Sequence, residues 1–283
     1  MKEALYYEKL GDGRVKCHLC PNKCVITDGG RGLCGVRVNK EGILYTEVYG
    51  KTTSVALDPI EKKPLYRYHP GENILSLGTK GCNFHCDFCQ NWQISQDINA
   101  PVCNITPQEM IDRARALGSF GIAYTYNEPF IWYEFVLDTA KLARKNALEN
   151  VLVTNGYVSP EPLEGMLPYI GAMNIDLKSF DEDFYTKICG GHLAPVLDTI
   201  KRSARSCHIE LTNLIIPTLN DSEKSVTKLV DWIADNVGPE VPLHFSGYFP
   251  CYKITFPPTP IETLRMAEQI AKKKLKYVYL GNV

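Results

Sequence analysis

The feature that most constrains the fold is a repeat of short apolar runs that alternate with amphipathic segments after residue 72. Each run is apolar almost throughout, which is typical of strands buried on both faces of a parallel sheet. Because parallel neighbours need a crossover helix between them, these units predict an α/β fold of the open or partial (β/α) barrel type. Seven runs are predicted as strands, at residues 73–79, 121–126, 150–155, 172–177, 209–216, 241–246 and 276–281.

The segments between the runs carry helix signals. In residues 106–118, Thr106 is placed to cap a helix, Pro107 to occupy its first position, Glu109 to complete a capping box and Gly118 to end it. In a barrel of this kind the active site lies at the carboxyl ends of the strands, so the residues after each run are candidates for chemistry. The same amphipathic period recurs at residues 130–147, 222–238 and 259–274.

Residues 1–72 break this pattern, and we expect them to form a separate metal-binding module packed on a barrel of residues 73–283. The module contains a cysteine cluster, a hairpin predicted around Gly50 and a proline-punctuated connector, DPIEKKPLYRYHPGE. We expect three side chains of the connector to cover the barrel mouth: Tyr66, Tyr68 and His69.

Charge and cysteine content limit the partners and the compartment. The 31 Lys and Arg residues nearly balance 32 Asp and Glu residues, so no global basic field would recruit nucleic acid or anionic lipid. Residues 1–17 contain no apolar run like that of a signal peptide, so we expect none, and no segment approaches the roughly 18 apolar residues of a membrane span. We therefore expect a cytoplasmic protein, in which its 11 cysteines are candidates for metal ligands or catalytic thiolates rather than disulfides.

Three of the cysteines, Cys82, Cys86 and Cys89, follow the first predicted strand in the stretch GTKGCNFHCDFCQNWQISQ. A C-x3-C-x2-C group can ligate three irons of a cubane cluster and leave the fourth iron open for a ligand. A zinc knuckle is the alternative, but zinc usually takes four ligands. The position at the carboxyl end of a strand favours the reactive cluster.

This loop resembles that of the radical S-adenosylmethionine (SAM) enzymes, which share the three-cysteine spacing and usually carry an aromatic residue where Phe88 stands. The resemblance implies a partial (β/α)6 TIM-like barrel and a [4Fe–4S] cluster held by Cys82, Cys86 and Cys89. It also implies that SAM binds the open iron and is cleaved reductively to a 5′-deoxyadenosyl radical, while the protein supplies positioning and redox tuning.

Later strand ends resemble the activating enzymes of glycyl-radical enzymes. By that resemblance Asn127 and Glu128, in TYNEP, would accept hydrogen bonds from the methionyl ammonium. Asp176 and Lys178, in NIDLKSF, would lie near SAM, with Lys178 pairing its carboxylate.

The segment VTNG contributes Thr154 and Asn155 as further cofactor-binding candidates, and His244 follows in PLHFSGYFP. The chain departs from the activating enzymes at Val153, where they carry an aspartate, and at Thr212, where they often carry an arginine.

Four other cysteines, Cys17, Cys20, Cys24 and Cys34, form a second candidate metal site with the spacing C-x2-C-x3-C-x9-C. Four thiolates can close the shell of a tetrahedral zinc ion or of a fully ligated [4Fe–4S] cluster, and the spacing leaves both open. The four remaining cysteines are interpreted first as structural side chains: Cys103, Cys189, Cys207 and Cys251.

Taken over the whole length, the chain resembles the AmmeMemoRadiSam radical SAM enzymes, which are related to the pyruvate formate-lyase activating enzyme. The match runs from KCHLCPNKCVI through DPIEKKPLYRYHPG to HFSGYFPCYK and YVYLGNV. The low potential that such clusters need implies a flavodoxin or ferredoxin as electron donor. The resemblance to activating enzymes implies a protein or peptide substrate, and the whole-length resemblance makes Memo-like or AMMECR1-like proteins candidates.

The sequence thus predicts an enzyme that cleaves SAM and abstracts hydrogen from a protein or peptide. Two alternatives stay open: a radical SAM enzyme that acts on a small molecule with an auxiliary cluster, and a non-catalytic metal-binding scaffold. The scaffold hypothesis predicts a colourless zinc protein that does not respond to SAM.

Overall fold

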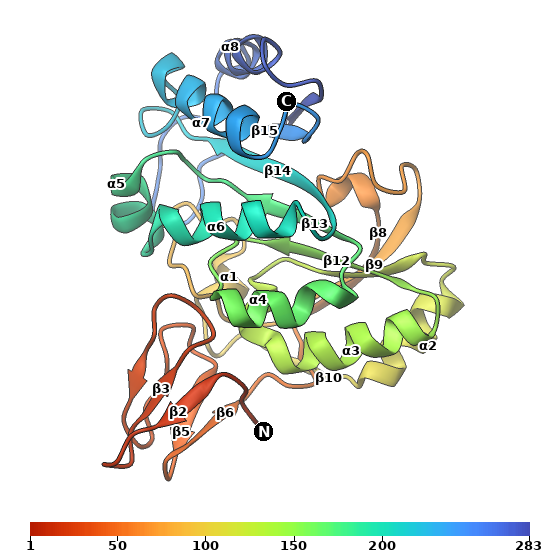
Figure 1. The fold of residues 1–283 in the computed structure, drawn as a ribbon, viewed down its shortest axis with the longest axis vertical. Coiled ribbons are helices and arrows are strands. Elements are labelled where there is room, and N and C mark those ends of the chain that lie inside the picture. The colour runs from red at the N-terminus through yellow and green to blue at the C-terminus, as the bar shows by residue number, and fades with distance from the viewer.

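An eight-stranded sheet forms the centre of the computed structural model, which describes residues 1–283 (Figure 1). The strand order is β16-β15-β14-β13-β12-β11-β9-β8, so the parallel strands follow one another in chain order across an open sheet. The antiparallel strand β8 (Ser54–Pro59) forms one edge beside β9. The parallel strands are β9 (Asn73–Gly78), β11 (Gly121–Tyr124), β12 (Glu149–Thr154), β13 (Ala172–Asp176), β14 (His208–Ile215), β15 (Leu243–Gly247) and β16 (Val278–Gly281).

A crossover helix joins each parallel strand to the next, as a parallel sheet requires. Helix α2 begins with the predicted capping box, in which the Thr106 side chain accepts from the Glu109 amide and the Glu109 carboxylate accepts from the Thr106 amide. The crossover helices are α2 (Pro107–Ala116), α3 (Tyr133–Lys145), α4 (Pro160–Met166), α6 (Leu193–Ser203), α7 (Glu223–Asn236) and α8 (Ile261–Ala271). Shorter turns are η1 (Ile60–Lys62), α1 (Trp92–Ser95), η2 (Pro129–Trp132), η3 (Leu167–Tyr169), α5 (Glu182–Phe184) and η4 (Tyr185–Cys189).

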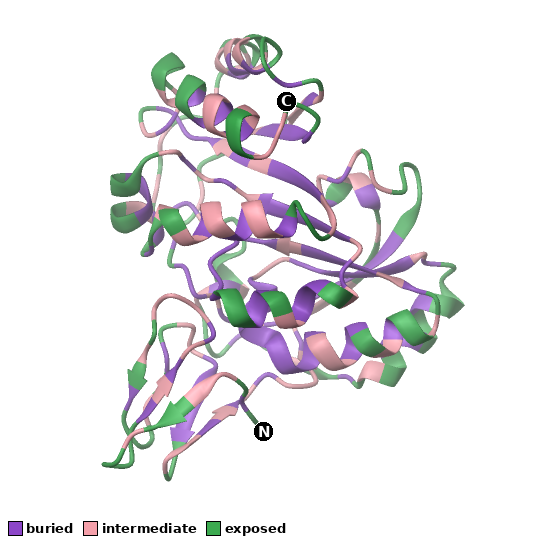
Figure 2. Cartoon of the chain, in the orientation of Figure 1, coloured by how far each residue is buried: buried purple, intermediate pink, exposed green.

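All seven parallel strands match the predicted runs to within two residues at either end. Buried residues lie along these strands, and exposed residues lie on the outer sides of the helices (Figure 2). No helix is long and apolar enough to cross a membrane.

The N-terminal strands form small sheets beside the large one (Figure 1). The hairpin predicted around Gly50 does not form, because β6 pairs with β1 and β5 and the hairpin turn lies at Glu41 and Gly42 instead. One sheet contains β1 (Lys2–Glu3), β6 (Ile43–Thr46) and β5 (Arg37–Lys40), and the other contains β2 (Tyr7–Lys9), β3 (Val15–Cys17) and β4 (Val25–Ile26). A separate pair consists of β7 (Lys51–Thr52) and β10 (Cys103–Asn104).

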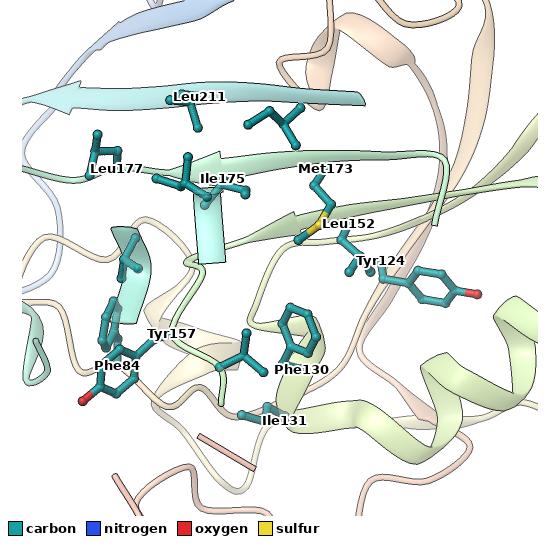
Figure 3. Packing of buried hydrophobic residues seen from close by; sticks show 14 of the residues in the cluster. Phe84, Tyr124, Phe130, Ile131, Leu152, Tyr157, Met173, Ile175, Leu177 and Leu211 are labelled. Carbon is teal, nitrogen blue, oxygen red and sulfur yellow. The ribbon is translucent and has the colours of Figure 1, made fainter. Parts of the chain in front are cut away.

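The N-terminal strands share a hydrophobic core with the large sheet. One cluster of 59 buried residues contains Val15 and Leu44 from the small sheets together with Leu77 and Leu211 from the large one. Part of this cluster is shown in Figure 3, where Phe84 of the cysteine loop packs beside Tyr157. Residues 1–46 are therefore packed onto the α/β body through apolar contacts, while β8 belongs to the large sheet itself.

The connector after β8 covers the amino ends of the parallel strands. Its side chains Ile60 and Leu65 are fully buried in a second cluster that contains Ile74 and Val151, near the start of β9 and β12. The expectation that the connector aromatics cover the barrel mouth is therefore wrong. Tyr68 donates to Glu149, the first residue of β12, at 3.0 Å, which is the end of the sheet opposite to the mouth.

Candidate active site

A pocket of about 400 Å³ opens at the carboxyl ends of the parallel strands. We call it the active-site pocket. Of the residues predicted to bind the cluster or SAM, only His244 is absent from its walls. The others come from the last residues of β12 and β13 and from the loops after β9, β11, β12 and β13: Cys82, Cys86, Phe88, Cys89, Asn127, Glu128, Thr154, Asn155, Asp176 and Lys178.

The three cysteines lie in the loop after β9, where backbone and side-chain donors approach the sulfur of Cys82. The backbone nitrogen of Phe84 lies 3.4 Å from Cys82 Sγ, and the side-chain Nδ2 of Asn155 lies 3.6 Å from it. Such N–H groups stabilise a sulfur that carries negative charge. Burial raises the pKa of Cys82, so a positive partner is needed to keep a thiolate there.

The end of η4 supports the cysteine loop through backbone hydrogen bonds. The His85 amide donates to the Cys189 carbonyl at 2.8 Å, and the Asp87 amide donates to the Ile188 carbonyl at 3.0 Å. A hydrogen bond from Cys189 and the charge of Lys178 lower the pKa of Cys86. Cys189 therefore lies against a predicted cluster ligand, although the sequence showed it only as a structural cysteine.

Glu128 is a buried carboxylate whose two oxygens are both occupied. Oε1 accepts from the Phe130 amide at 2.9 Å and from the Thr154 hydroxyl at 2.8 Å, while Oε2 accepts from the Asn155 amide at 2.8 Å. Burial raises the pKa of Glu128 to about 7, although these three donors favour the ionised form. Glu128 thus joins the ends of β11 and β12 and places its carboxyl group on the pocket wall.

Asn127 lines the pocket, but its side chain is used to hold the cysteine loop. Its oxygen accepts from the Thr79 amide at 3.0 Å, and its nitrogen donates to the Gly81 carbonyl at 2.9 Å. This geometry makes Asn127 a positioning residue for the backbone immediately before Cys82.

Asp176 and Lys178, at the end of β13, form an ion pair of 2.9 Å on the pocket wall. Burial alone would lower the pKa of Lys178, but the carboxylate of Asp176 and the nearby cysteines raise it. The ammonium also lies 5.7 Å from the ring centre of Phe88, which is 5 % exposed. Lys178 is therefore a cation on the pocket wall, with N–H donors beyond the one that Asp176 accepts.

The floor of the pocket includes residues that the sequence did not single out. Lys63 is 3 % exposed, and its ammonium donates to Asp58 at 2.8 Å. The hydroxyl of Tyr126 donates to the same carboxylate at 2.8 Å. In the sequence these residues show only as a pair of lysines in the connector. Only the folded chain places Lys63 beside Tyr126.

His244 does not line the pocket, which corrects its prediction as a cofactor ligand. Its Nε2 is paired with Glu210 at 2.6 Å, and its ring packs on Tyr66 and Tyr279 with centroids 4.7 and 5.0 Å apart. Glu210 is fully buried and also accepts from the Arg67 amide at 2.7 Å. The reason is strand direction, since the second residue of β15 lies toward its amino end, where the connector packs.

The N-terminal cysteines lie in a different cavity. Cys17, Cys20, Cys24 and Cys34 line a space of about 20 Å³ together with Arg37, whose side chain is buried and pairs with Glu134. As the side chains stand, no three His, Cys, Asp or Glu side chains are arranged to hold a metal ion, here or in the active-site pocket. Metal binding at either set of cysteines therefore stays a prediction. Cys103, expected to pack as a small apolar side chain, is exposed on β10.

Comparisons with known proteins agree with this geometry. Residues 76–233 match the model of the Radical SAM superfamily. The uncharacterized protein MJ0808 of Methanocaldococcus jannaschii is 48% identical over 288 residues, which cover 100% of this chain and 86% of that protein. The pyruvate formate-lyase-activating enzyme of Clostridium pasteurianum is 23% identical over 164 residues, which cover 54% of this chain and 66% of that enzyme.

Among solved structures, a domain of the pyruvate-formate lyase-activating enzyme from Bacteroides vulgatus superposes with a TM-score of 0.51 at 20% identity. The match covers 57% of this chain and 98% of that domain, and it shows a shared α/β fold.

Proposed function

Because the chain belongs to the radical SAM superfamily, we propose that it cleaves SAM reductively at a [4Fe–4S] cluster and uses the resulting radical to abstract hydrogen from a protein or peptide. The observation that carries the proposal is the convergence of the cysteine loop with the ends of β11, β12 and β13 on one pocket of about 400 Å³. Family membership implies both cofactors.

The donor set fits the cluster. Three thiols, from Cys82, Cys86 and Cys89, lie on one wall of the pocket, and the set leaves one iron of a cubane without a protein ligand. The N–H groups near Cys82 Sγ and the ammonium of Lys178 supply the positive charge that thiolates require. When bound, the reduced cluster and SAM supply the 5′-deoxyadenosyl radical.

The residues around the thiols are proposed to bind the charged groups of SAM. Lys178 is the partner that we propose for the SAM carboxylate, because Asp176 occupies only one of its N–H donors. Glu128 is the proposed hydrogen-bond acceptor for the SAM ammonium, whose positive charge would favour the ionised carboxylate, and it is held in place by Thr154 and by Asn155. These assignments need no movement of the strands, because every group already lines the pocket.

We also propose that the walls of the pocket hold the target carbon close to the radical, since an uncommitted radical would abstract hydrogen from other C–H or S–H bonds. Phe88 contributes apolar surface on one wall, and the connector residues Lys63 and Pro64 contribute the floor. The sheet would be the partial barrel of the radical SAM type, with the small sheets of residues 1–46 as a metal-binding module beside it. The boundary predicted after residue 72 lies too late, because β8 is a strand of the large sheet.

The substrate class rests on the relatives. Two of them are named as the pyruvate formate-lyase-activating enzyme and the isethionate sulfite-lyase activating enzyme, which act on other enzymes according to their names. We propose a protein or peptide substrate by this similarity, and the AmmeMemoRadiSam resemblance makes Memo-like and AMMECR1-like proteins the first candidates. A flavodoxin or ferredoxin is the proposed electron donor, because such clusters work at low potential.

The test is anaerobic SAM cleavage. The chain is reconstituted with iron and sulfide, reduced with dithionite and mixed with SAM, and 5′-deoxyadenosine is quantified beside an EPR spectrum of the cluster. We expect 5′-deoxyadenosine and a SAM-dependent change in the spectrum. Cys82→Ala should lose both, whereas Cys103→Ala, at an exposed cysteine on β10, should keep both.

A cluster that forms but neither cleaves SAM nor changes its spectrum on SAM addition would overturn the proposal. A colourless zinc protein that is indifferent to SAM would instead favour the scaffold. The substrate is tested separately, by deuterium transfer from a labelled candidate protein into 5′-deoxyadenosine.

A further inference from the structure

The four N-terminal cysteines are brought together by two tight turns. In the first turn the Cys17 amide donates to the Cys24 carbonyl at 2.9 Å, and the Lys23 amide donates to the Cys20 carbonyl at 3.1 Å. In the second, the Gly35 amide donates to the Gly32 carbonyl at 2.9 Å, on either side of Cys34. Both turns face the same cavity, whose walls contain all four cysteines.

The size of this cavity indicates whether it can hold a single metal ion or a cluster. Its volume is about 20 Å³, against about 400 Å³ for the active-site pocket. A space of roughly 10–15 Å³ on this scale holds one water-sized particle. A single metal ion therefore fits between the four thiols, whereas a cubane of four irons and four sulfides would have to push the turns apart.

The walls are partly apolar. Besides the cysteines, the cavity is lined by the buried side chains of Leu19, Ile26 and Ile131 and, toward solvent, by Asn22 and Lys23. Four thiolates already fill a tetrahedral shell and leave no open coordination position for a substrate, which is typical of a structural zinc site rather than a catalytic one.

Donors suited to thiolates are already present. The Leu33 amide lies 3.5 Å from Cys24 Sγ, and Nη1 of Arg37 lies 3.8 Å from Cys17 Sγ. Arg37 is 1 % exposed, and its Nε has no hydrogen-bond partner. Because Arg37 also pairs with the buried carboxylate of Glu134, it supplies the Cys17 sulfur with a hydrogen-bond donor rather than with an uncompensated positive charge.

From these observations we infer that Cys17, Cys20, Cys24 and Cys34 hold a single zinc ion, distinct from the cluster site at Cys82. The thiols line the cavity without yet meeting at one point. Binding therefore includes rotation of the cysteine side chains into the cavity, a change between staggered rotamers that leaves the two turns in place.

The zinc site lies directly against the cysteine loop of the active-site pocket. The Asn22 side chain donates to the Asn83 carbonyl at 3.0 Å, and the Ser159 amide donates to the Leu19 carbonyl at 3.0 Å. Asn83 in turn accepts at its side-chain oxygen from Asn155 at 2.9 Å. The ion would therefore fix the turn that supports the residue after Cys82.

The experiment counts metals in the intact chain. The protein is expressed with both iron and zinc in the medium, purified without oxygen, reconstituted and measured by inductively coupled plasma mass spectrometry. We expect about one zinc and about four irons per chain. Cys34→Ser should lose the zinc and keep the iron, Cys82→Ala should lose the iron and keep the zinc, and Cys103→Ala should keep both.

About eight irons per chain without zinc would overturn the inference and assign an auxiliary cluster to the N-terminal site. Because a cysteine variant can fail to fold, the intact chain is also loaded with Co²⁺ in place of zinc. Intense visible absorption from tetrahedral Co²⁺ bound by thiolates supports the site, and octahedral Co²⁺ spectra refute it. Neither readout depends on SAM cleavage, so the zinc site and the proposed activity can fail separately.

Discussion

The buried carboxyl of Glu128 makes the stability of this protein depend on pH in a way that one substitution should remove. Its oxygens accept from the amides of Phe130 and Asn155 and from the hydroxyl of Thr154. In Glu128→Gln the side chain keeps its shape but has only one accepting oxygen, so one buried backbone N–H loses its acceptor. We expect that loss to cost about 1–3 kcal/mol of unfolding free energy.

The sign of the pH effect follows from proton binding. Burial raises the pKa of Glu128 to about 7 from an ordinary value of 4.5, so the folded chain holds this proton where the unfolded chain has released it. Stability from this group is fully present below pH 4.5 and is lost as the pH rises to about 7. At about 1.4 kcal/mol per pH unit, the loss is on the order of 3 kcal/mol.

The assay is urea unfolding of wild type and Glu128→Gln, without added metal or SAM, at several values between about pH 5 and pH 8. The variant should be less stable than wild type by about 2 kcal/mol at the acid end and should equal or exceed it at the alkaline end. Glu262→Gln, at an exposed position in the first turn of α8, controls for the loss of a carboxylate.

A free-energy difference that stays constant across this range would refute the reasoning. It would mean that Glu128 is ionised in the folded chain throughout, and that its three hydrogen-bond donors outweigh burial.

Three further predictions concern the support of the pocket. Gly81→Ala should lower the free energy of unfolding by several kcal/mol, because φ at Gly81 is +90° and a Cβ there would lie 2.5 Å from a backbone oxygen of the N-terminal module. Gly118→Ala, at φ +64° in open space, should lower the free energy of unfolding by only about 1 kcal/mol. Equal urea midpoints for the two variants would contradict this prediction. Lys178→Met should weaken SAM binding to the reconstituted protein at least about tenfold in equilibrium dialysis while iron content stays unchanged, and full affinity would remove Lys178 from the SAM site. Glu210→Ala should cost about 3–5 kcal/mol in urea unfolding, since it leaves His244 and a backbone amide unpaired in the core, and a cost below 1 kcal/mol would show that this network adds little.

Much of the secondary structure could be predicted from local sequence. The run at residues 172–177 became β13 (Ala172–Asp176), and the capping box at Thr106 formed at the start of α2. Both depend on side chains within a few positions of one another, whose period and hydrogen-bonding capacity already specify strand or helix. The order of the strand-end motifs also sufficed to place Glu128 and Lys178 on one pocket, because parallel strands share their carboxyl edge.

Other features were set only by tertiary structure. The sequence showed Asn127 as a free acceptor, but the folded chain uses its amide to hold Thr79 and Gly81. It showed His244 at a strand end, but not that the connector would bury it against Glu210.

The sequence by itself determined the alternation of strands and helices, their boundaries and the two cysteine sets, because these depend on neighbours along the chain. Tertiary structure decided which end of the sheet the connector covers, that Lys63 reaches the pocket beside Tyr126, and that the N-terminal thiols surround a space for one ion. Lys63 and Tyr126 are far apart in the sequence, as are the N-terminal thiols and Ile131, which lines the same cavity. Their meeting depends on the packing of the whole core, which no local pattern encodes.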